Sequence, residues 1–490
     1  MRRIEELQFD NTYARLPAHF YSRVAPTSFP DPYLVSFNAT AAAELLDLDR
    51  SEASRPEFVE YFSGGRALPG AEPLAMLYAG HQFGSYVPQL GDGRAILLGE
   101  VRNARGEKWD LHLKGAGQTP YSRGFDGRAV LRSTIREYLC GEAMHALGIP
   151  SSRALCIVGS DAPVRRETIE TAAMLVRLAE SHVRFGTFEV FYYRGQHERV
   201  RELADYCIAN YFPELVEAED SYRQFLLEAT RRTARLIARW QAVGFAHGVM
   251  NTDNMSVLGF TLDYGPFGFL DDYHAGFICN HSDHSGRYAF DQQPAVGLWN
   301  ASRLAQTLVS LMTVDEAMAA LEVYQPAFAA HYGELMRAKL GLSTEAEDDA
   351  KLILSLLGLL EANAVDYTNF FRRLGNFKTA GDAPHDELRD MFVEPTAFDA
   401  WAARYRARLL REASTDAERK ARMDGVNPKY VLRNYLAQNA ISAAVERRDY
   451  TEIERLHALL SAPFAEQPDM ERYAAPPPDW GKRLAVSCSS

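Results

Sequence analysis

Four polar residues of this sequence have side chains that suit phosphate and metal chemistry. Lys114 lies at the end of a strand-like segment, and Glu137 lies in the helix-like segment that follows it. Asn254 and Asp263 come much later, the first in a loop and the second at the start of an Asp-Tyr-Gly turn. A lysine binds phosphate oxygens as a point charge, and Mg²⁺ takes oxygen ligands such as carboxylates and amides. Each residue alone has a simpler explanation, such as a surface charge or an Asx turn.

The order of these residues along the chain is more specific than their types. The lysine is followed by a glycine-rich loop (115–128), the helix with the glutamate, a long helix, a loop with His-Gly and Asp-Asn (247–254), and the Asp-Tyr-Gly turn. In protein-kinase-like folds a strand lysine binds ATP phosphates and pairs with a helix glutamate, while an Asn and the Asp before a Gly hold metal ions. The order therefore predicts an α+β, bilobal, protein-kinase-like fold, with an N-terminal extension and a large helical C-terminal part.

The loop after the long helix departs from the pattern of a working kinase. A kinase places its catalytic Asp soon after the His of this loop, but here the triplet is His247-Gly248-Val249. Valine cannot accept a proton, and the nearest carboxylate is Asp253. Two interpretations remain open: the chain is catalytically inactive, or a different group acts as the base in a changed geometry. Both disfavour ordinary phosphoryl transfer.

Three arginines form a second departure. Arg94 follows a Gly-Asp-Gly turn that contains Gly91 and Gly93, and Arg177 and Arg184 flank a short loop. Guanidinium groups bind phosphate oxygens in a bidentate manner. Together with the strand lysine, the arginines would hold a β/γ-phosphate pair deep in a pocket and leave the α-phosphate within reach. Taken singly, each arginine is better explained by a surface salt bridge.

An acidic residue interrupts the glycine-rich loop at Asp126-Gly127. Phosphates usually occupy this part of a nucleotide site, so a carboxylate here indicates that another part of ATP lies nearby. The alternative is a simple Asp-Gly turn.

The pattern of apolar residues predicts the elements that position these side chains. A β-hairpin is expected from strands 95–101 and 108–114, and further elements are a helix at 131–147, a strand at 173–180, a helix at 224–244, a strand and turn at 261–273, and amphipathic helices from about 300 to 460. We expect an N-terminal extension (1–70) that wraps around the core, an N-lobe with the nucleotide-binding loops (71–200), and a mostly helical C-lobe with the catalytic loop and the C-terminal tail (201–490).

Composition excludes several classes of protein. The formal net charge is −12, and an acidic chain repels phosphate backbones, so we expect no nucleic-acid partner. The five cysteines include no CxxC pair, which argues against a zinc site. Their odd number argues against a secreted disulfide framework. The most apolar stretch, 352–360, is far shorter than the roughly 20 residues of a membrane span, and the N-terminus lacks the features of a signal peptide. We therefore expect a cytoplasmic protein without a membrane partner.

At the level of whole motifs, the chain resembles the selenoprotein O family, also called the YdiU family of protein adenylyltransferases, which are pseudokinases. The resemblance covers nearly the full length. The segments that carry it are 78–95, 113–140, 247–271 and 427–441.

The resemblance implies a kinase-like fold that binds ATP in a flipped orientation and transfers AMP to Ser, Thr or Tyr hydroxyls of proteins. It implies that Asp253 is the catalytic base and that Asn254 and Asp263 hold Mg²⁺ or Mn²⁺. It further implies a supporting ion pair between Glu137 and Lys114. The positions that it assigns to the nucleotide are Gly91, Gly93, Arg94, Lys114, Asp126, Gly127, Arg177, Arg184 and Asp263.

The same resemblance draws attention to the C-terminus, where eukaryotic members carry selenocysteine and many bacterial members carry cysteine. Here the tail carries Cys488, and Cys279 follows the Asp-Tyr-Gly segment. We hypothesise a regulatory disulfide between the two, against the alternative of two unrelated thiols. The family suggests target proteins of redox homeostasis.

Three functions compete at this point. AMP transfer is the first, phosphorylation with an unusual base is the second, and a non-catalytic nucleotide-binding scaffold is the third. Val249 argues against the second, and the retained metal-ligand types argue against the third. UMP transfer from UTP with Mn²⁺ is a variant of the first, and the sequence does not separate adenine from uracil preference. Oligomeric state is also left open.

Overall fold

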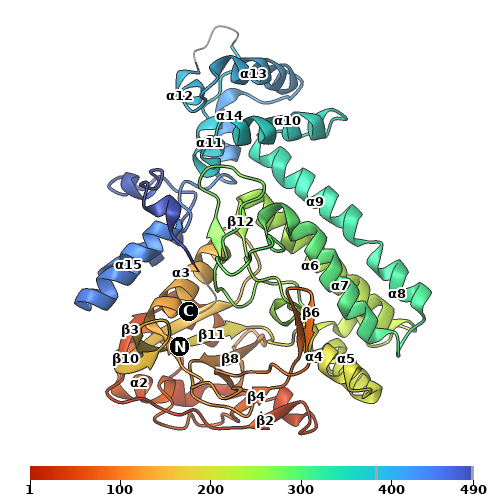
Figure 1. Cartoon of the computed structure of the whole chain (residues 1–490), viewed down its shortest axis with the longest axis vertical. Coiled ribbons are helices and arrows are strands. Elements are labelled where there is room, and N and C mark those ends of the chain that lie inside the picture. Colours follow the sequence, from red (N-terminus) through yellow and green to blue (C-terminus); the bar gives the residue numbers. More distant parts are fainter. Residues whose placement is uncertain (381–384, 487–490) are drawn as a thin grey trace.

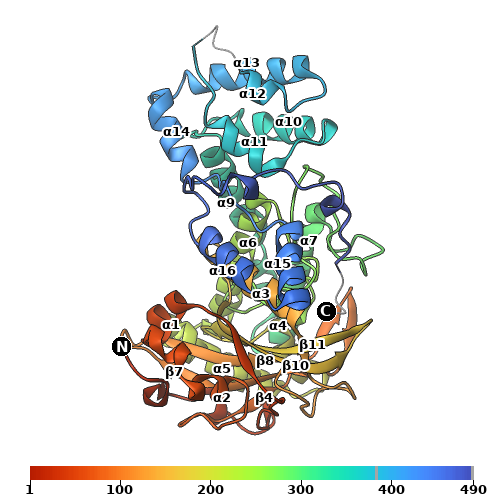
Figure 2. The same cartoon turned by 90° about the vertical axis from the view of Figure 1, so that its left-hand side faces the viewer.

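The computed structural model describes residues 1–380 and 385–486, and it divides into a sheet-rich end and a helical end (Figures 1 and 2). The sheet has nine strands in the order β2-β4-β7-β8-β11-β10-β3, with β1 paired to β7 and β9 to β11. Every pairing in it is antiparallel. The α+β prediction is confirmed at this level. The strands of this sheet are β1 (Gln8–Phe9), β2 (Tyr21–Arg23), β3 (Tyr33–Phe37), β4 (Leu74–Met76), β7 (Ala95–Arg102), β8 (Lys108–Lys114), β9 (Ala129–Val130), β10 (Arg153–Arg165) and β11 (Ile169–Ala179).

Two short antiparallel pairs lie outside this sheet. They are β5 (Gly80–Gln82) with β6 (Ser85–Val87), and β12 (Phe245–Ala246) with β13 (Gly268–Phe269). Figure 1 shows β6 at the junction between the sheet and the helical part.

The helices of the sheet-rich end and of the junction are α1 (Ala39–Leu46), α2 (Pro56–Phe62), α3 (Leu131–Ala146), α4 (Phe185–Tyr193), α5 (His197–Tyr211), α6 (Ser221–Val243) and α7 (Gln293–Leu308). The remaining helices are α8 (Val314–Leu321), α9 (Tyr324–Lys339), α10 (Asp349–Ala362), α11 (Tyr367–Leu374), α12 (Asp386–Arg389), α13 (Pro395–Leu409), α14 (Asp416–Asp424), α15 (Asn434–Arg447) and α16 (Thr451–Leu460). Figure 2 shows α10 to α14 at the end of the molecule far from the sheet. None of the helices in the described ranges is both long and apolar enough to pass through a bilayer.

The predicted hairpin is present as β7 and β8, with Ala95 opposite Lys114. Its turn is closed by Asn103, whose side-chain oxygen accepts hydrogen bonds from the amides of Arg105 and Glu107 at 3.1 and 3.0 Å. Successive side chains of a strand point to opposite faces. Leu111 and Leu113 therefore enter the core shared with the N-terminal helices, and Lys114 points to the other face.

The predicted helix 131–147 is α3, which ends where Gly148 adopts a left-handed backbone with φ of 73°. Ile135 and Leu139 bury its apolar side in a core that also contains Leu175 of β11. This packing fixes the height of Glu137 above the sheet. The predicted helix 224–244 is α6, and Gly244 ends it in the left-handed conformation.

One expected strand is shorter than predicted, and one strand was not predicted. The segment 261–273 forms only the two-residue strand β13, because Asp263 has a φ of 56° and breaks the extended backbone. The long strand β10 was not anticipated, since Gly159 and Pro163 interrupt its apolar run. The strand accommodates them with register shifts, one of which lies between Ser160 and Pro163.

Candidate active site

A chain of buried ion pairs joins the sheet to α3 and to the Asp-Tyr-Gly segment. The Lys114 ammonium at the end of β8 pairs with the Glu137 carboxylate of α3. Arg177 of β11 lies between two acids, with Nε 2.5 Å from Oε1 of Glu137 and Nη1 2.7 Å from Oδ1 of Asp263. Lys114, Glu137 and Arg177 are each no more than 5% exposed. The sequence-predicted pair of Lys114 and Glu137 thus exists, and Arg177 extends it.

Arg184 connects this cluster to the loop that carries Asp253. Its guanidinium pairs with Oδ2 of Asp263, and Nη1 donates to the backbone oxygen of Asp253 at 2.7 Å. The guanidinium also lies over the ring of Tyr78, 4.8 Å from its centroid, a favourable cation–π arrangement. Arg184 is therefore the physical link between the cationic cluster and the loop.

Burial and neighbouring charge set the protonation of these groups. Burial lowers the pKa of Lys114 to about 8. Burial alone would raise the pKa of Asp263, but the charges of Arg184 and Arg177 outweigh it and hold the pKa well below its usual range. Asp263 is therefore an anion held between two cations.

Arg94 differs from the other cations because its side chain has no hydrogen-bond or ion-pair partner among the described residues. Burial, and then repulsion by Arg177, lower the pKa of its guanidinium. Arg94 is partly buried, and a desolvated cation without a partner is costly. An anionic ligand such as a phosphate would remove that cost.

The carboxylate of Asp253 also makes fewer hydrogen bonds than it could. It lies in a short 3₁₀ helix (Thr252–Asn254) and is 8% exposed. Its Oδ2 accepts a hydrogen bond of 3.3 Å from Gln82, whereas its buried Oδ1 has no partner. Burial raises the pKa of Asp253 to about 7. A carboxylate with a pKa near neutrality and a free oxygen is suited to accept a proton.

Packing explains the glycines around this carboxylate. A Cβ at Gly80 would lie 2.4 Å from Oδ1 of Asp253, so only glycine leaves room for that oxygen. At Gly91, which has a φ of 75°, a Cβ would lie 2.6 Å from the ring of Tyr121. Tyr121 belongs to the loop 115–128, and Gly91 therefore lets this loop pack against the turn that carries Arg94.

A family model described as "Protein adenylyltransferase SelO" matches residues 3–461. The chain belongs to this family. Three curated relatives are described as "Protein nucleotidyltransferase YdiU". They come from Myxococcus xanthus, at 64% identity over 490 residues, Thiobacillus denitrificans, at 61% over 490, and Thioalkalivibrio sulfidiphilus, at 60% over 496. In each case the match covers all of this chain and all of the relative. The protein is thus an enzyme of the nucleotidyltransferase class.

Of the two residues expected to hold a metal, Asn254 has a free oxygen and Asp263 does not. Asn254 donates its Nδ2 to the backbone oxygen of Val249 at 3.0 Å, which leaves the amide oxygen without a donor among the described residues. The unpartnered oxygen of Asp253 is the second available ligand. Both oxygens of Asp263 are engaged by arginines. The described residues contain no cluster of three or more His, Cys, Asp or Glu side chains that could hold a metal, so phosphate oxygens would have to complete the shell.

The other expected nucleotide positions differ in their surroundings. A Cβ at Gly93 would lie 2.9 Å from the backbone oxygen of Tyr121, and one at Gly127 would lie 2.0 Å from that of Gly117. Both glycines therefore serve close loop packing. Asp126 lies at the surface, where it pairs with Arg166 at 2.9 Å. The structure does not bring Asp126 into the buried cluster.

Three residues that sequence reasoning missed hold the Asp253 loop in place. The amide of His81 donates to Oγ1 of Thr252 at 2.7 Å, and that hydroxyl donates to Glu189 at 2.7 Å. Glu189 also contacts Nδ1 of His81 at 2.8 Å, which closes the ring of contacts. His81 lies in the segment 78–95, one of the long motifs that carry the family resemblance. Its place in that motif was the signal that could have identified it.

The hypothesis of a disulfide stays untested, because Cys488 lies outside the described residues. Cys279 is buried, with its Sγ 2.7 Å from the backbone oxygen of Pro266. Two residues further on, the amide of His281 donates to the backbone oxygen of Val486 at 2.8 Å. The last described part of the tail therefore contacts the segment that carries Cys279.

Proposed function

We propose that this nucleotidyltransferase transfers AMP from ATP to Ser, Thr or Tyr hydroxyls of target proteins and releases pyrophosphate. The observation that carries the proposal is the buried Asp253, which combines a pKa of about 7, a free oxygen and a link through Arg184 to the cationic cluster. The sheet with its strand lysine, the paired helix glutamate and the Asp-Tyr-Gly segment support a protein-kinase-like architecture.

The charges of the site favour one orientation of the nucleotide. Lys114 and Arg177 are almost completely buried, and the side chain of Arg94 has no partner in the part of the chain that the structure describes. We infer that these cations bind the β- and γ-phosphates and hold the leaving pyrophosphate. The α-phosphate would then be the one presented toward Asp253.

Asp253 accepts the proton of the target hydroxyl as its oxygen attacks the α-phosphorus. The new bond joins that oxygen to phosphorus, and the bond from the α-phosphorus to the oxygen bridging to the β-phosphate breaks. Asn254 would hold Mg²⁺ or Mn²⁺ together with Asp263, which would have to exchange one of its two arginine contacts for the ion. The ion would supply charge neutralisation at the phosphates. Asp263 also orients Arg177 and Arg184, because it pairs with both.

The decisive experiment is incubation of the full chain with ATP, Mg²⁺ and a bacterial lysate, followed by intact-protein and peptide mass spectrometry. Parallel samples contain UTP, or Mn²⁺ in place of Mg²⁺. A mass gain of one AMP on Ser, Thr or Tyr supports the proposal. A gain of phosphate would overturn it in favour of kinase activity, and a gain of UMP alone would replace the nucleotide assignment.

A further inference from the structure

The surface beside Asp253 carries arginines that no carboxylate neutralises. It is built from Phe83 at the tip of the β5–β6 hairpin, Arg194 after α4, Arg287 before α7, and Trp299 and Arg303 on α7. We call these five residues the arginine platform. The Arg287 guanidinium lies 4.7 Å from the Trp299 ring centroid, and that of Arg303 lies 5.1 Å from it. The indole thus lies between two cations.

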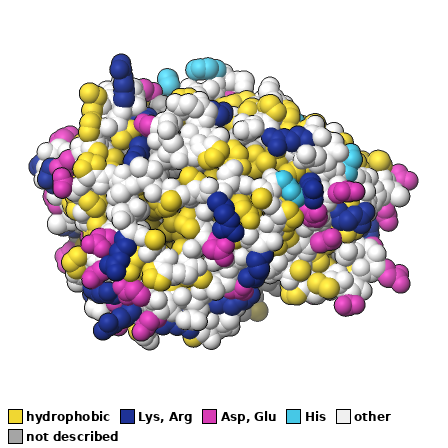
Figure 3. Space-filling model, turned by 90° about the horizontal axis from the view of Figure 1, so that it is seen from below, with side chains coloured by type: hydrophobic (Ala, Val, Ile, Leu, Met, Phe, Trp, Pro, Cys, Tyr) yellow, Lys and Arg dark blue, Asp and Glu magenta, His cyan; other side chains and the backbone are white. Residues whose placement is uncertain are grey.

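None of the three arginines forms an ion pair among the described residues. Arg194 donates to the amide oxygen of Gln89 at 3.3 Å, and the Nε of Arg287 is buried without a partner. The nearby Asp283 is occupied by other donors, since it accepts from the backbone amides of Arg287 and Tyr288. On the underside of the molecule, basic and acidic side chains lie near one another (Figure 3). The platform is therefore a local positive surface on a chain of net charge −12.

Hydrogen bonds tie the platform to the loop that carries the proposed base. The amide of Phe83 donates to the hydroxyl of Tyr288 at 2.8 Å, and this hydroxyl donates to Oδ1 of Asn251 at 2.6 Å. Gln82, next to Phe83, contacts Asp253 directly. The side chain of Phe83 is 41% exposed although it is aromatic. A polypeptide that presents a hydroxyl to Asp253 would pass over this surface.

We propose that the arginine platform docks the target protein and selects acceptor hydroxyls that are flanked by acidic residues. This inference rests on the proposed function, because it names the class of substrate for the same site. Arginines beside an exposed aromatic ring are typical of surfaces that recognise acidic segments. An acidic protein segment fits better than a nucleic acid, because the long-range field of an acidic chain repels a long polyanion.

The test compares two peptides that share one tyrosine acceptor, flanked on both sides by aspartates in one and by asparagines in the other. Binding is measured by fluorescence anisotropy without nucleotide, and AMP transfer by kcat/KM. We expect the full chain to prefer the aspartate peptide in both measurements. Added salt should shrink the preference, because it screens exposed charges.

The variants are Arg303→Gln, Arg194→Gln and the double variant Arg287→Gln/Arg303→Gln. The double variant should lower kcat/KM for the aspartate peptide by roughly tenfold, since exposed charge pairs are individually weak, and leave the asparagine peptide unchanged. The matched control is Arg201→Gln on α5, since Arg201 also lies over an aromatic ring, that of Tyr222, and forms no ion pair within residues 1–380 and 385–486. If the double variant unfolds, the two single variants carry the test.

Equal use of both peptides, or a preference that survives in the platform variants, would overturn the docking proposal and leave AMP transfer intact. Tighter binding of a single-stranded oligonucleotide than of the aspartate peptide would also overturn it. Absence of AMP transfer to either peptide and to lysate proteins would instead contradict the proposed function. Because the anisotropy measurement needs no chemistry, the two failures are distinguishable.

Discussion

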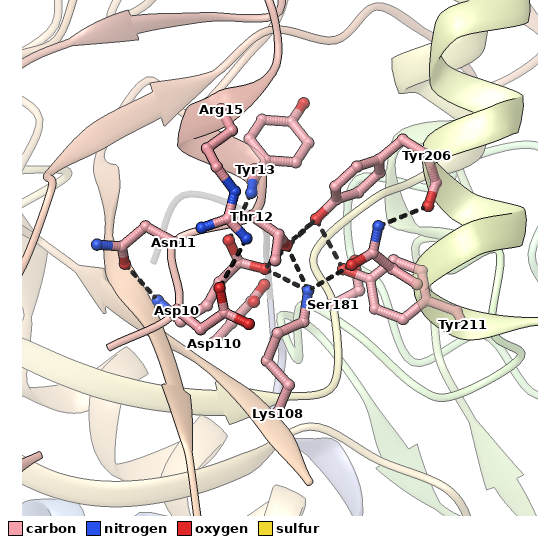
Figure 4. Close-up of polar contacts among 12 residues, drawn as sticks. Asp10, Asn11, Thr12, Tyr13, Arg15, Lys108, Asp110, Ser181, Tyr206 and Tyr211 are labelled. Atoms are coloured by element: carbon pink, nitrogen blue, oxygen red, sulfur yellow. Dashed lines mark hydrogen bonds and ion pairs between the residues drawn. The ribbon is translucent and has the colours of Figure 1, made fainter. Parts of the chain in front are cut away.

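Two buried ionic clusters share strand β8, and they differ in how completely their polar groups are satisfied. In the first, around Lys108, the ammonium lies 2.6 Å from Glu100 and 2.5 Å from the hydroxyl of Thr12 (Figure 4). The other oxygen of Glu100 accepts from the amide of Tyr13 at 2.5 Å, and the hydroxyl of Tyr206 contacts that of Thr12 at 2.8 Å. This cluster holds the N-terminal segment and α5 against the sheet.

The second cluster, around Lys114, leaves groups unpaired. Among the described residues, the side chain of Arg94 has no partner, and neither has Oδ1 of Asp253. Near Lys108 the hydroxyl of Tyr13 is buried without a partner, but it is a neutral group. An unpaired charge is costlier to bury than a neutral hydroxyl, so the difference favours the Lys114 cluster as the one that binds a ligand. Burial of charge alone does not distinguish them, because both lysines are buried.

The largest expected effect is on the reaction itself. Asp253→Asn keeps the shape of the side chain but removes the base, so kcat for AMP transfer should fall by about 10²- to 10⁴-fold. The parent enzyme needs Asp253 ionised, so its rate should rise with pH and level off above about 7, the pKa of this group. Initial rates across this pH range check both points. A variant with the parent rate and pH profile would show that Asp253 is not the base.

The next prediction contrasts the two lysines. Lys108→Met leaves the buried Glu100 without its cation, which should destabilise the fold by about 3–5 kcal/mol. Lys114→Met should cost less, because Glu137 keeps its contact with Arg177, but it should lose most of the AMP transfer.

Thermal melting and transfer rates of both lysine variants provide the measurement. A larger loss of melting temperature in Lys114→Met than in Lys108→Met would contradict the distinction between a structural and a ligand-binding cluster.

The smallest effect concerns Arg94. Because this guanidinium has no partner among the described residues, Arg94→Gln removes an uncompensated charge and should not lower the melting temperature. It should raise the KM for ATP by roughly tenfold, because the variant loses about the binding free energy of one hydrogen bond to a charged group. Arg166→Gln is the control, since Arg166 pairs with the surface residue Asp126 and should change KM less. An unchanged KM in Arg94→Gln would remove Arg94 from the nucleotide site.

From the sequence alone we predicted the order, along the chain, of the site residues and of the elements that carry them. Alternating apolar residues predicted the strand that ends at Lys114, and apolar residues at helical spacing predicted the helix that carries Glu137. Both predictions were correct because these periodicities are local properties of a strand and a helix. The same reasoning gave the β7–β8 hairpin and the end of α6 at Gly244. It also pointed to Asp253, since Val249 cannot act as a base. The family resemblance, which the comparisons confirm, supplied the class of reaction.

Only the tertiary structure decided which of these groups have partners. Arg177 and Arg184 share Asp263 because β11 and the start of α4 pack against a loop far away in sequence. Among the described residues, Arg94 has no such partner. No local pattern encodes such distances. The raised pKa of Asp253 likewise follows from burial under Gly80 and the β5–β6 hairpin, because desolvation is set by everything that packs around a group rather than by its neighbours in the chain.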